Sequence, residues 1–209
     1  MKLYLFGGAE VELGQVEPEL KLIEGVIKSL PVKQILHIPF ARTTATETEW
    51  SGDWIHRYME LGNLQYLNAE NEEDIAKAKS PLIFISGGSN SPRLIEKTIG
   101  DHRLMKLISN SPYIIGEAAG SKALGEYLRS KGNNPESSII SGLGIIKDTI
   151  IEPHYTERGR QELLTQSMEK SNAHIGVGID AMTAIAFELN EFPKKYETIG
   201  LGKVVVKTR

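Results

Sequence analysis

A pentapeptide near the middle of the chain has the spacing of a nucleophile elbow, G-x-S-x-G. Residues 116–120 read Gly-Glu-Ala-Ala-Gly, after an apolar run and before a segment with helical composition. Such a strand-to-helix turn lifts its central side chain above the helix N-terminus, where backbone N–H groups can stabilise an oxyanion. The central residue is Ala118, and a methyl group cannot attack a carbonyl. The segment therefore has the layout of an acyl-transfer site without its hydroxyl.

Two further loops could complete such a site. Residues 86–90 (Ser-Gly-Gly-Ser-Asn) follow another apolar run, and bare glycine amides there could also stabilise an oxyanion. His154 lies between a predicted strand and a predicted helix that Thr156 could cap, where a general base could reach the crevice. Each feature alone also fits a bland interpretation: a small-residue turn, a β–α glycine turn, and a structural or solvated histidine.

The apolar pattern predicts the elements that must position these residues. Strands are predicted at 3–6, 34–38, 64–67, 82–85 and 113–115, and helices at 18–30, 50–61, 70–79, 92–98, 102–109 and 121–129. After a turn at 131–135, strands are predicted at 139–140, 145–146, 150–151, 175–179, 183–189 and 204–207, with one helix at about 156–170. This order favours a mostly parallel α/β sheet with helices on both faces, and extra antiparallel strands toward the C-terminus, in a single domain 1–209. The crevice of such a sheet lies beyond the carboxyl ends of its strands.

Composition excludes several classes of function. The chain has 209 residues and no cysteine, so disulfides, thiolate metal sites and a cysteine nucleophile are excluded. The formal net charge of −3 gives no basic field for nucleic acid, and no apolar run is long enough to span a membrane. The N-terminus does not resemble a secretory signal, and the five histidines form no close pair. We therefore expect a cytoplasmic protein without a metal site.

Four segments of the chain resemble the serine peptidase family of aspartyl dipeptidase (peptidase E) and cyanophycinase. They are Ile35–Ala41, Phe84–Asn90, Pro112–Gly120 and Gly142–Arg160, with a looser match over Gly176–Ala184. The resemblance implies a class I glutamine amidotransferase-like α/β fold. It also implies hydrolysis of small peptides, often after aspartate, without a cofactor. The protein would be a monomer or a homodimer.

The resemblance implies a role for each matched residue. Ala118 stands where the family has its nucleophilic serine, His154 stands at the general base, and the amides of Gly88 and Ala119 would form the oxyanion hole. Asp180 is one candidate to orient His154, although the family often has a glutamate at the next position, which here is Ala181. Glu152 and Glu157 are less obvious orienters because they lie close to His154 in sequence, and Glu10 and Glu12 look like a solvated acidic loop.

Substrate contacts are predicted in two loops. Asn90 ends the Gly–Gly loop, and Arg42 begins a polar stretch with Thr43, Thr44, Thr46 and Thr48. Arginine offers a forked donor to a substrate carboxylate, although a polar surface loop would have the same composition. Ser121 is expected to be a residue of the helix start and not a substitute nucleophile.

The alanine at position 118 allows two interpretations. Intact surroundings favour a deliberate or recent serine-to-alanine change in an enzyme, which leaves the chain inactive as written. The alternative is a natural pseudoenzyme that binds a small molecule or a peptide. Glutamine amidotransferase chemistry is excluded, because it needs a cysteine at the elbow.

Overall fold

The computed structural model describes residues 1–43, 50–131 and 137–209. Its larger sheet has seven strands in the order β11-β10-β1-β5-β4-β2-β3. Strands β1 to β5 run parallel to one another, and β10 pairs antiparallel with both β1 and β11. The strands are β1 (Lys2–Phe6), β2 (Gln34–Ile38), β3 (Gln65–Asn68), β4 (Leu82–Ile85), β5 (Tyr113–Glu117), β10 (Thr183–Glu188) and β11 (Glu197–Gly200).

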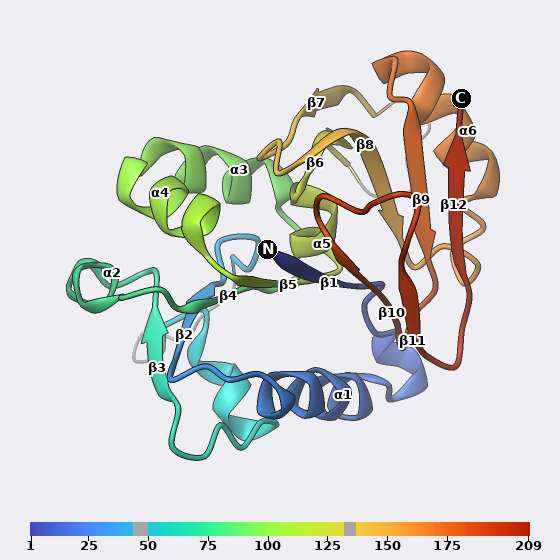
Figure 1. Ribbon diagram of the computed structural model, residues 1–209. Helices are drawn as coiled ribbons and strands as arrows, with labels where there is room; N and C mark the ends of the chain where they lie inside the picture. The colour runs from blue at the N-terminus through green and yellow to red at the C-terminus, as the bar shows by residue number, and fades with distance from the viewer. Residues whose placement is uncertain (44–49, 132–136) are drawn as a thin grey trace.

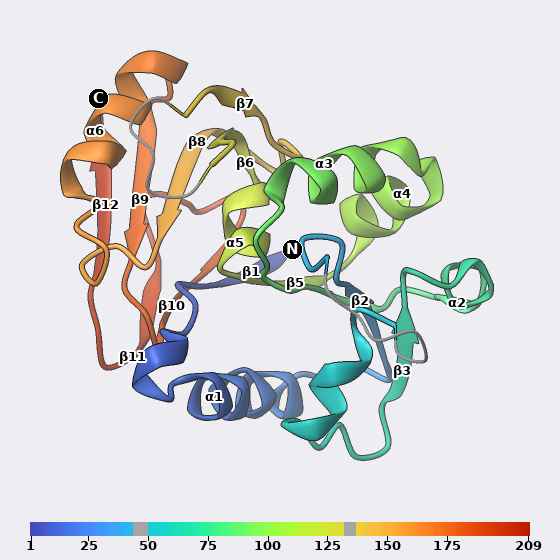
Figure 2. The same ribbon diagram turned by 180° about the vertical axis from the view of Figure 1, so that it is seen from behind.

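Helices cover both faces of this sheet (Figures 1 and 2). On one face α1 (Val16–Ser29) packs Ile23 and Ile27 against Phe6 of the sheet. On the other face α3 (Ser91–Gly100) and α4 (His102–Asn110) pack apolar side chains against Ile85 and its neighbours. The remaining short elements are η1 (Val11–Leu13), η2 (Asp53–Arg57) and α2 (Glu72–Lys77).

A second sheet of five strands stands beside the first, in the order β12-β9-β8-β6-β7. Helix α6 (Gln161–Ser171) covers one face through Leu164 and Met168, which pack with Ile150. The short helix α5 (Ala119–Ala123) lies between the two sheets and contacts β5, β6 and β8 (Figure 1). The strands are β6 (Gly125–Arg129), β7 (Ile139–Ser141), β8 (Ile146–Pro153), β9 (Ile175–Ile179) and β12 (Val204–Thr208).

The structure confirms the predicted fold class and corrects several elements. The predicted helix 121–129 is wrong, because α5 ends at Ala123 and the chain continues as β6. The helix predicted at 50–61 is a single five-residue 3-10 segment, η2. Helix α6 begins at Gln161 with Arg160 at its N-cap, so Thr156 does not cap it. Two predicted strands, 145–146 and 150–151, are one strand, β8. The turn predicted at 131–135 lies outside the described residues except for Lys131.

Candidate active site

The pentapeptide 116–120 forms a sharp turn from β5 into α5. Its central residue, Ala118, has φ 49° and ψ −107°, a backbone conformation that L residues rarely adopt. The flanking glycines make the turn possible: a Cβ on Gly116 would lie 2.7 Å from Ser121 Cα, and one on Gly120 would collide with the Ile85 carbonyl. The Ser121 hydroxyl is buried and donates to the Phe6 carbonyl at 2.7 Å. It is thus a structural residue and not a substitute nucleophile.

His154 directly follows β8 and faces the elbow. Its backbone has φ 50°, and its N–H donates to the Gly7 carbonyl at 2.9 Å. A Cβ placed on Gly8 would lie 2.6 Å from His154 Nε2 and 2.9 Å from the Ala118 Cβ. The imidazole Nε2 and the Ala118 methyl group therefore both lie within 3.0 Å of the position that a Cβ on Gly8 would occupy. Only glycine fits there, both for space and because φ at Gly8 is 96°.

The carboxylate beside His154 belongs to Glu10, which sequence reasoning placed in a solvated loop. Glu10 Oε1 lies 2.7 Å from His154 Nδ1, a distance typical of an ion pair, although the angle is outside the range of a hydrogen bond. Arg158 clamps the same carboxylate, with Nε 2.8 Å from Oε1 and Nη2 3.1 Å from Oε2. The one available sequence signal was the position of Glu10, just after the Gly7–Gly8 turn at the end of β1.

Asp180 is not brought to the imidazole. Its Oδ1 accepts from the Thr156 amide at 3.0 Å, and its Oδ2 accepts from the Lys203 amide at 2.9 Å. The prediction that Asp180 orients His154 thus differs from the contacts observed, because both oxygens hold the backbone of neighbouring loops. Of the two other acidic candidates, Glu157 is exposed, and Glu152 is fully buried and paired with Arg129.

The surroundings keep the imidazole neutral. The pKa of His154 is lowered to about 4, chiefly by burial and also by the cations Arg158 and Arg160, while Glu10 acts in the opposite direction. Burial would raise the pKa of Glu10, but hydrogen bonding to Arg158 and the charge that His154 carries when protonated in acid outweigh it, so the pKa of Glu10 lies below its ordinary value. At neutral pH the site therefore holds an unprotonated imidazole beside an ionised carboxylate, which is the state that a general base requires.

The predicted oxyanion hole lies where the carboxyl end of β4 meets the elbow. The amides of Gly88 and Ala119 make no hydrogen bond to any residue in the part of the chain that the structure describes. The amide of Gly87 donates instead to the Glu117 carboxylate, and burial raises the pKa of Glu117. Burial also raises the pKa of Glu19 on α1, and the charge of Glu117 adds to the effect. Two carboxyl groups with raised pKa values therefore line the α1 side of the elbow.

Arg42 and Asn90, the two predicted substrate-binding residues, differ in the hydrogen bonds that their side chains make. The guanidinium carbon of Arg42 lies 4.0 Å from the centre of the Trp54 ring, and Arg42 Nε is buried with no hydrogen-bond partner among the described residues. The Asn90 side-chain oxygen accepts from the Arg93 amide at 3.0 Å and caps α3. The predicted contacts at Thr44, Thr46 and Thr48 lie outside the described residues.

His37, on β2 beneath this edge of the sheet, has a structural role. It is fully buried, with Nδ1 2.8 Å from the Tyr66 hydroxyl and Nε2 2.7 Å from the Ser86 hydroxyl. Burial lowers its pKa to about 3, and the charges of Arg42 and His56 act in the same direction.

The depressed pKa of His37 predicts a loss of stability in acid. A histidine whose folded pKa lies below its unfolded value of about 6.5 contributes full stability above that value and loses it as pH falls toward the folded pKa. The measurement is urea unfolding of the unmodified chain and of His37→Gln at pH 7.5 and at pH 5. Between these two pH values, we expect the free energy of unfolding to fall by about 2 kcal/mol more in the unmodified chain than in His37→Gln. Equal falls in the two proteins would contradict a neutral, buried His37.

Among the described residues, no three His, Asp or Glu side chains gather in a way that could hold a metal ion. Within the same part of the chain, no helix is both long enough and apolar enough to cross a membrane.

Comparisons with solved structures show the same fold. A crystal structure of a peptidase from an acI-B1 Actinobacterium superposes with a TM-score of 0.61 at 22% identity, covering 99% of this chain and 90% of that one. A candidate peptidase E protein from Listeria monocytogenes EGD-e has a TM-score of 0.58 at 18% identity, covering 96% and 98%. The chain thus has the class I glutamine amidotransferase-like fold of these peptidases.

Sequence comparisons agree. The chain is 28% identical over 149 residues to cyanophycinase from Synechococcus elongatus, which is 66% of this chain and 45% of that protein. It is 30% identical over 97 residues to cyanophycinase from Geminocystis herdmanii, covering 44% and 35%. The chain spans about half the length of the curated relatives it matches. The model of peptidase family S51 matches residues 3–194. Since this match covers nearly the whole chain, the protein belongs to peptidase family S51.

Proposed function

We propose that this chain carries the site of a serine-type peptidase for small peptides, with Ala118 at the nucleophile position, and that it is inactive as written. One observation carries the proposal: His154 Nε2 and the Ala118 Cβ converge on the same point over Gly8. A hydroxyl added to that methyl group would lie beside a neutral imidazole. Membership of peptidase family S51 supports the same chemistry.

The proposed mechanism needs only the chain's own residues. With Ala118→Ser, His154 Nε2 would take the hydroxyl proton as the oxygen attacks the peptide carbonyl. The amides of Gly88 and Ala119 would hold the oxyanion, and His154 would pass the proton to the leaving amine. Water would then hydrolyse the acyl-enzyme by the same route. In this proposal Glu10, and not Asp180, keeps the proton on Nδ1 so that Nε2 can accept one.

The proposed substrates are small peptides that carry a carboxylate near the scissile bond, as aspartyl peptides do. Arg42 supports this choice, because its Nε is buried without a hydrogen-bond partner among the described residues and its guanidinium carbon lies 4.0 Å from the centre of the Trp54 ring. A planar guanidinium fixed in this way suits a carboxylate. Asn90 remains a proposed contact through its amide nitrogen, since its oxygen caps α3. The absence of cysteine fits the proposed cytoplasmic location.

A pseudoenzyme that binds peptides is the second candidate. Two departures from the family pattern favour it, Ala118 at the nucleophile and Ala181 where the family often has a glutamate. The position of Glu10 argues the other way, because it supplies a carboxylate to His154 from a different loop. A chain that had lost its function would have no reason to keep that pair.

Labelling with a fluorophosphonate probe separates the two candidates. We expect the probe to label Ala118→Ser and to leave both the unmodified chain and Ala118→Ser/His154→Ala unlabelled. Mass spectrometry of the labelled peptide locates the adduct. If Ala118→Ser folds and is not labelled, the latent-enzyme proposal fails and the binding protein is the better account.

A further inference from the structure

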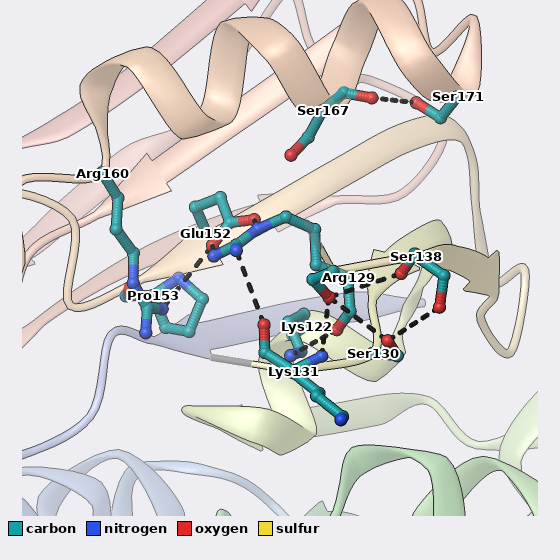
Figure 3. A network of polar contacts seen from close by, with 11 residues as sticks. Lys122, Arg129, Ser130, Lys131, Ser138, Glu152, Pro153, Arg160, Ser167 and Ser171 are labelled. Carbon is teal, nitrogen blue, oxygen red and sulfur yellow. Dashed lines mark hydrogen bonds and ion pairs between the residues drawn. The ribbon is translucent and has the colours of Figure 1, made fainter. Parts of the chain in front are cut away.

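Figure 3 shows a buried network of charged side chains around Glu152, which lies two residues before the candidate base His154 in the sequence. At its centre is Glu152 on β8, which is 0% exposed. Arg129 on β6 grips both of its oxygens, with Nε 2.5 Å from Oε1 and Nη2 2.9 Å from Oε2. Arg160 Nη1 lies 3.5 Å from Glu152 Oε2. Charged groups are seldom buried so completely unless they are paired.

The network reaches the backbone on both sides of the candidate site. Arg160 Nη1 donates to the carbonyl of Pro153, the residue before His154, at 2.7 Å. At the other end, Lys122 Nζ donates to the Arg129 carbonyl at 2.8 Å. Lys122 belongs to α5, and its own amide donates to the Ala118 carbonyl at 3.0 Å. One continuous chain of contacts therefore joins the end of β8 to the elbow.

This connection matters because the two reacting positions come from different sheets. Ala118 follows β5 of the seven-stranded sheet, and His154 follows β8 of the five-stranded sheet. Both residues have positive φ, 49° and 50°, so surrounding contacts must hold each backbone in an unfavourable conformation. Ladder hydrogen bonds within one sheet cannot fix the distance to a residue in the other. The backbone bond from His154 to Gly7 makes one direct link between the sheets, and the Glu152 group, which reaches α5 through Lys122, adds a second.

We infer that Glu152 is a positioning residue, which acts with Arg129 and Arg160 to set the place and charge environment of His154 relative to Ala118. Glu152 does not touch the crevice, so it acts only through its neighbours. The inference rests on the proposed function in taking His154 as the general base.

The charges around His154 predict in which direction its protonation should shift when Glu152 is neutralised. The charged groups that act on His154 are Glu10 from the loop after β1, and Arg158 and Arg160 from its own loop. Glu152 balances the charge of Arg160. Neutralising Glu152 should leave more positive charge near the imidazole and disfavour its protonated form.

The test compares the effect of neutralising two buried glutamates, Glu152 and Glu24. NMR of the histidine Cε1–H groups is recorded for the unmodified chain, for Glu152→Gln and for Glu24→Gln. Glu24 on α1 is a matched control, since it is 6% exposed and paired with Lys21 and Lys28 but lies on the helix that covers the seven-stranded sheet. We expect Glu152→Gln to move the His154 resonance and lower its pKa, and Glu24→Gln to leave both unchanged. In Glu152→Asp, which keeps the negative charge, the His154 resonance should lie between its positions in Glu152→Gln and in the unmodified chain. An unmoved His154 resonance in Glu152→Gln, or an equal shift in Glu24→Gln, overturns the inference.

A second arm measures the expected consequence for reactivity. In the Ala118→Ser background, Glu152→Gln should slow fluorophosphonate labelling at least tenfold, and Glu24→Gln should not. If Ala118→Ser itself is not labelled, the proposed function fails while the NMR comparison still decides the positioning role. Should Glu152→Gln not fold, Glu152→Gln/Arg129→Gln removes both charges together and takes its place in the NMR comparison.

Discussion

Ala118→Ser is expected to raise the rate of peptide hydrolysis by on the order of 10⁴ to 10⁶-fold over the chain as written. Loss of the nucleophile from a hydrolase triad costs a factor of that size, because the remaining groups supply only binding and oxyanion stabilisation. The proposed site otherwise holds a neutral imidazole, an adjacent carboxylate and the amides of Gly88 and Ala119, which have no hydrogen-bond partner among the described residues. The measurement is kcat/KM for dipeptides with an N-terminal aspartate, followed by release of free amino acids.

Two variants test whether the gain belongs to the hydroxyl. Ala118→Gly changes the same residue without adding an oxygen and should stay at the level of the unmodified chain. Ala118→Ser/His154→Gln keeps the oxygen and removes the base, and should lose almost all of the gain. Hydrolysis by the unmodified chain at ordinary enzyme rates would show that the elbow is not the catalytic centre.

The sequence predicts the positions of the strands and turns around this site well where its signals are local. The apolar runs before Ser86 and Gly116 locate β4 and β5, and the small residues of the elbow mark the sharp turn that the structure contains. His154 was predicted to follow a strand, and it directly follows β8. These features follow from residues that are neighbours in the chain, so periodicity and turn chemistry are sufficient to find them.

The prediction failed where distant contacts override local propensity. The segment 121–129 has helical spacing of its charges, yet from Gly125 onward it pairs with β7 and β8. The side chain of Arg129 explains part of this choice, since as a strand residue it reaches the buried carboxylate of Glu152. Strand pairing depends on partners that a single-sequence window does not contain.

Glu10 illustrates the same limit at the level of function. In the sequence it is one of two acidic residues in a polar loop, and its partner His154 lies far along the chain. The structure brings them together because Gly7 and Gly8 end β1 where the end of β8 passes, with the His154 amide bonded to the Gly7 carbonyl. Asp180 had the better sequence context, but the direction of its side chain is set by loop amides that no motif reveals.

In the Ala118→Ser background, Glu10→Gln is expected to lower kcat by on the order of 10² to 10⁴-fold. An amide in place of the triad carboxylate can present its NH₂ group to the imidazole and favour the tautomer with the proton on Nε2, which cannot accept a proton from the hydroxyl. Loss of the negative charge also disfavours the imidazolium that forms during reaction, so the pKa of His154 should fall. KM should change little, since Glu10 is placed to act on the imidazole. Steady-state kinetics of the two variants give both numbers.

The comparison that decides between the two acids is Asp180→Asn in the same background. Because the oxygens of Asp180 accept hydrogen bonds from the amides of Thr156 and Lys203, the main effect of this change should be a lower thermal stability. The kcat of the protein that remains folded should be affected less. Arg158→Gln supplies a second contrast: it removes a cation that lowers the His154 pKa while leaving Glu10 in place, so that pKa should rise and kcat should stay within about tenfold. A larger loss of kcat in Asp180→Asn than in Glu10→Gln would identify Asp180, and not Glu10, as the carboxylate that acts on His154. It would also mean that the short Glu10–His154 contact serves only to close the loop.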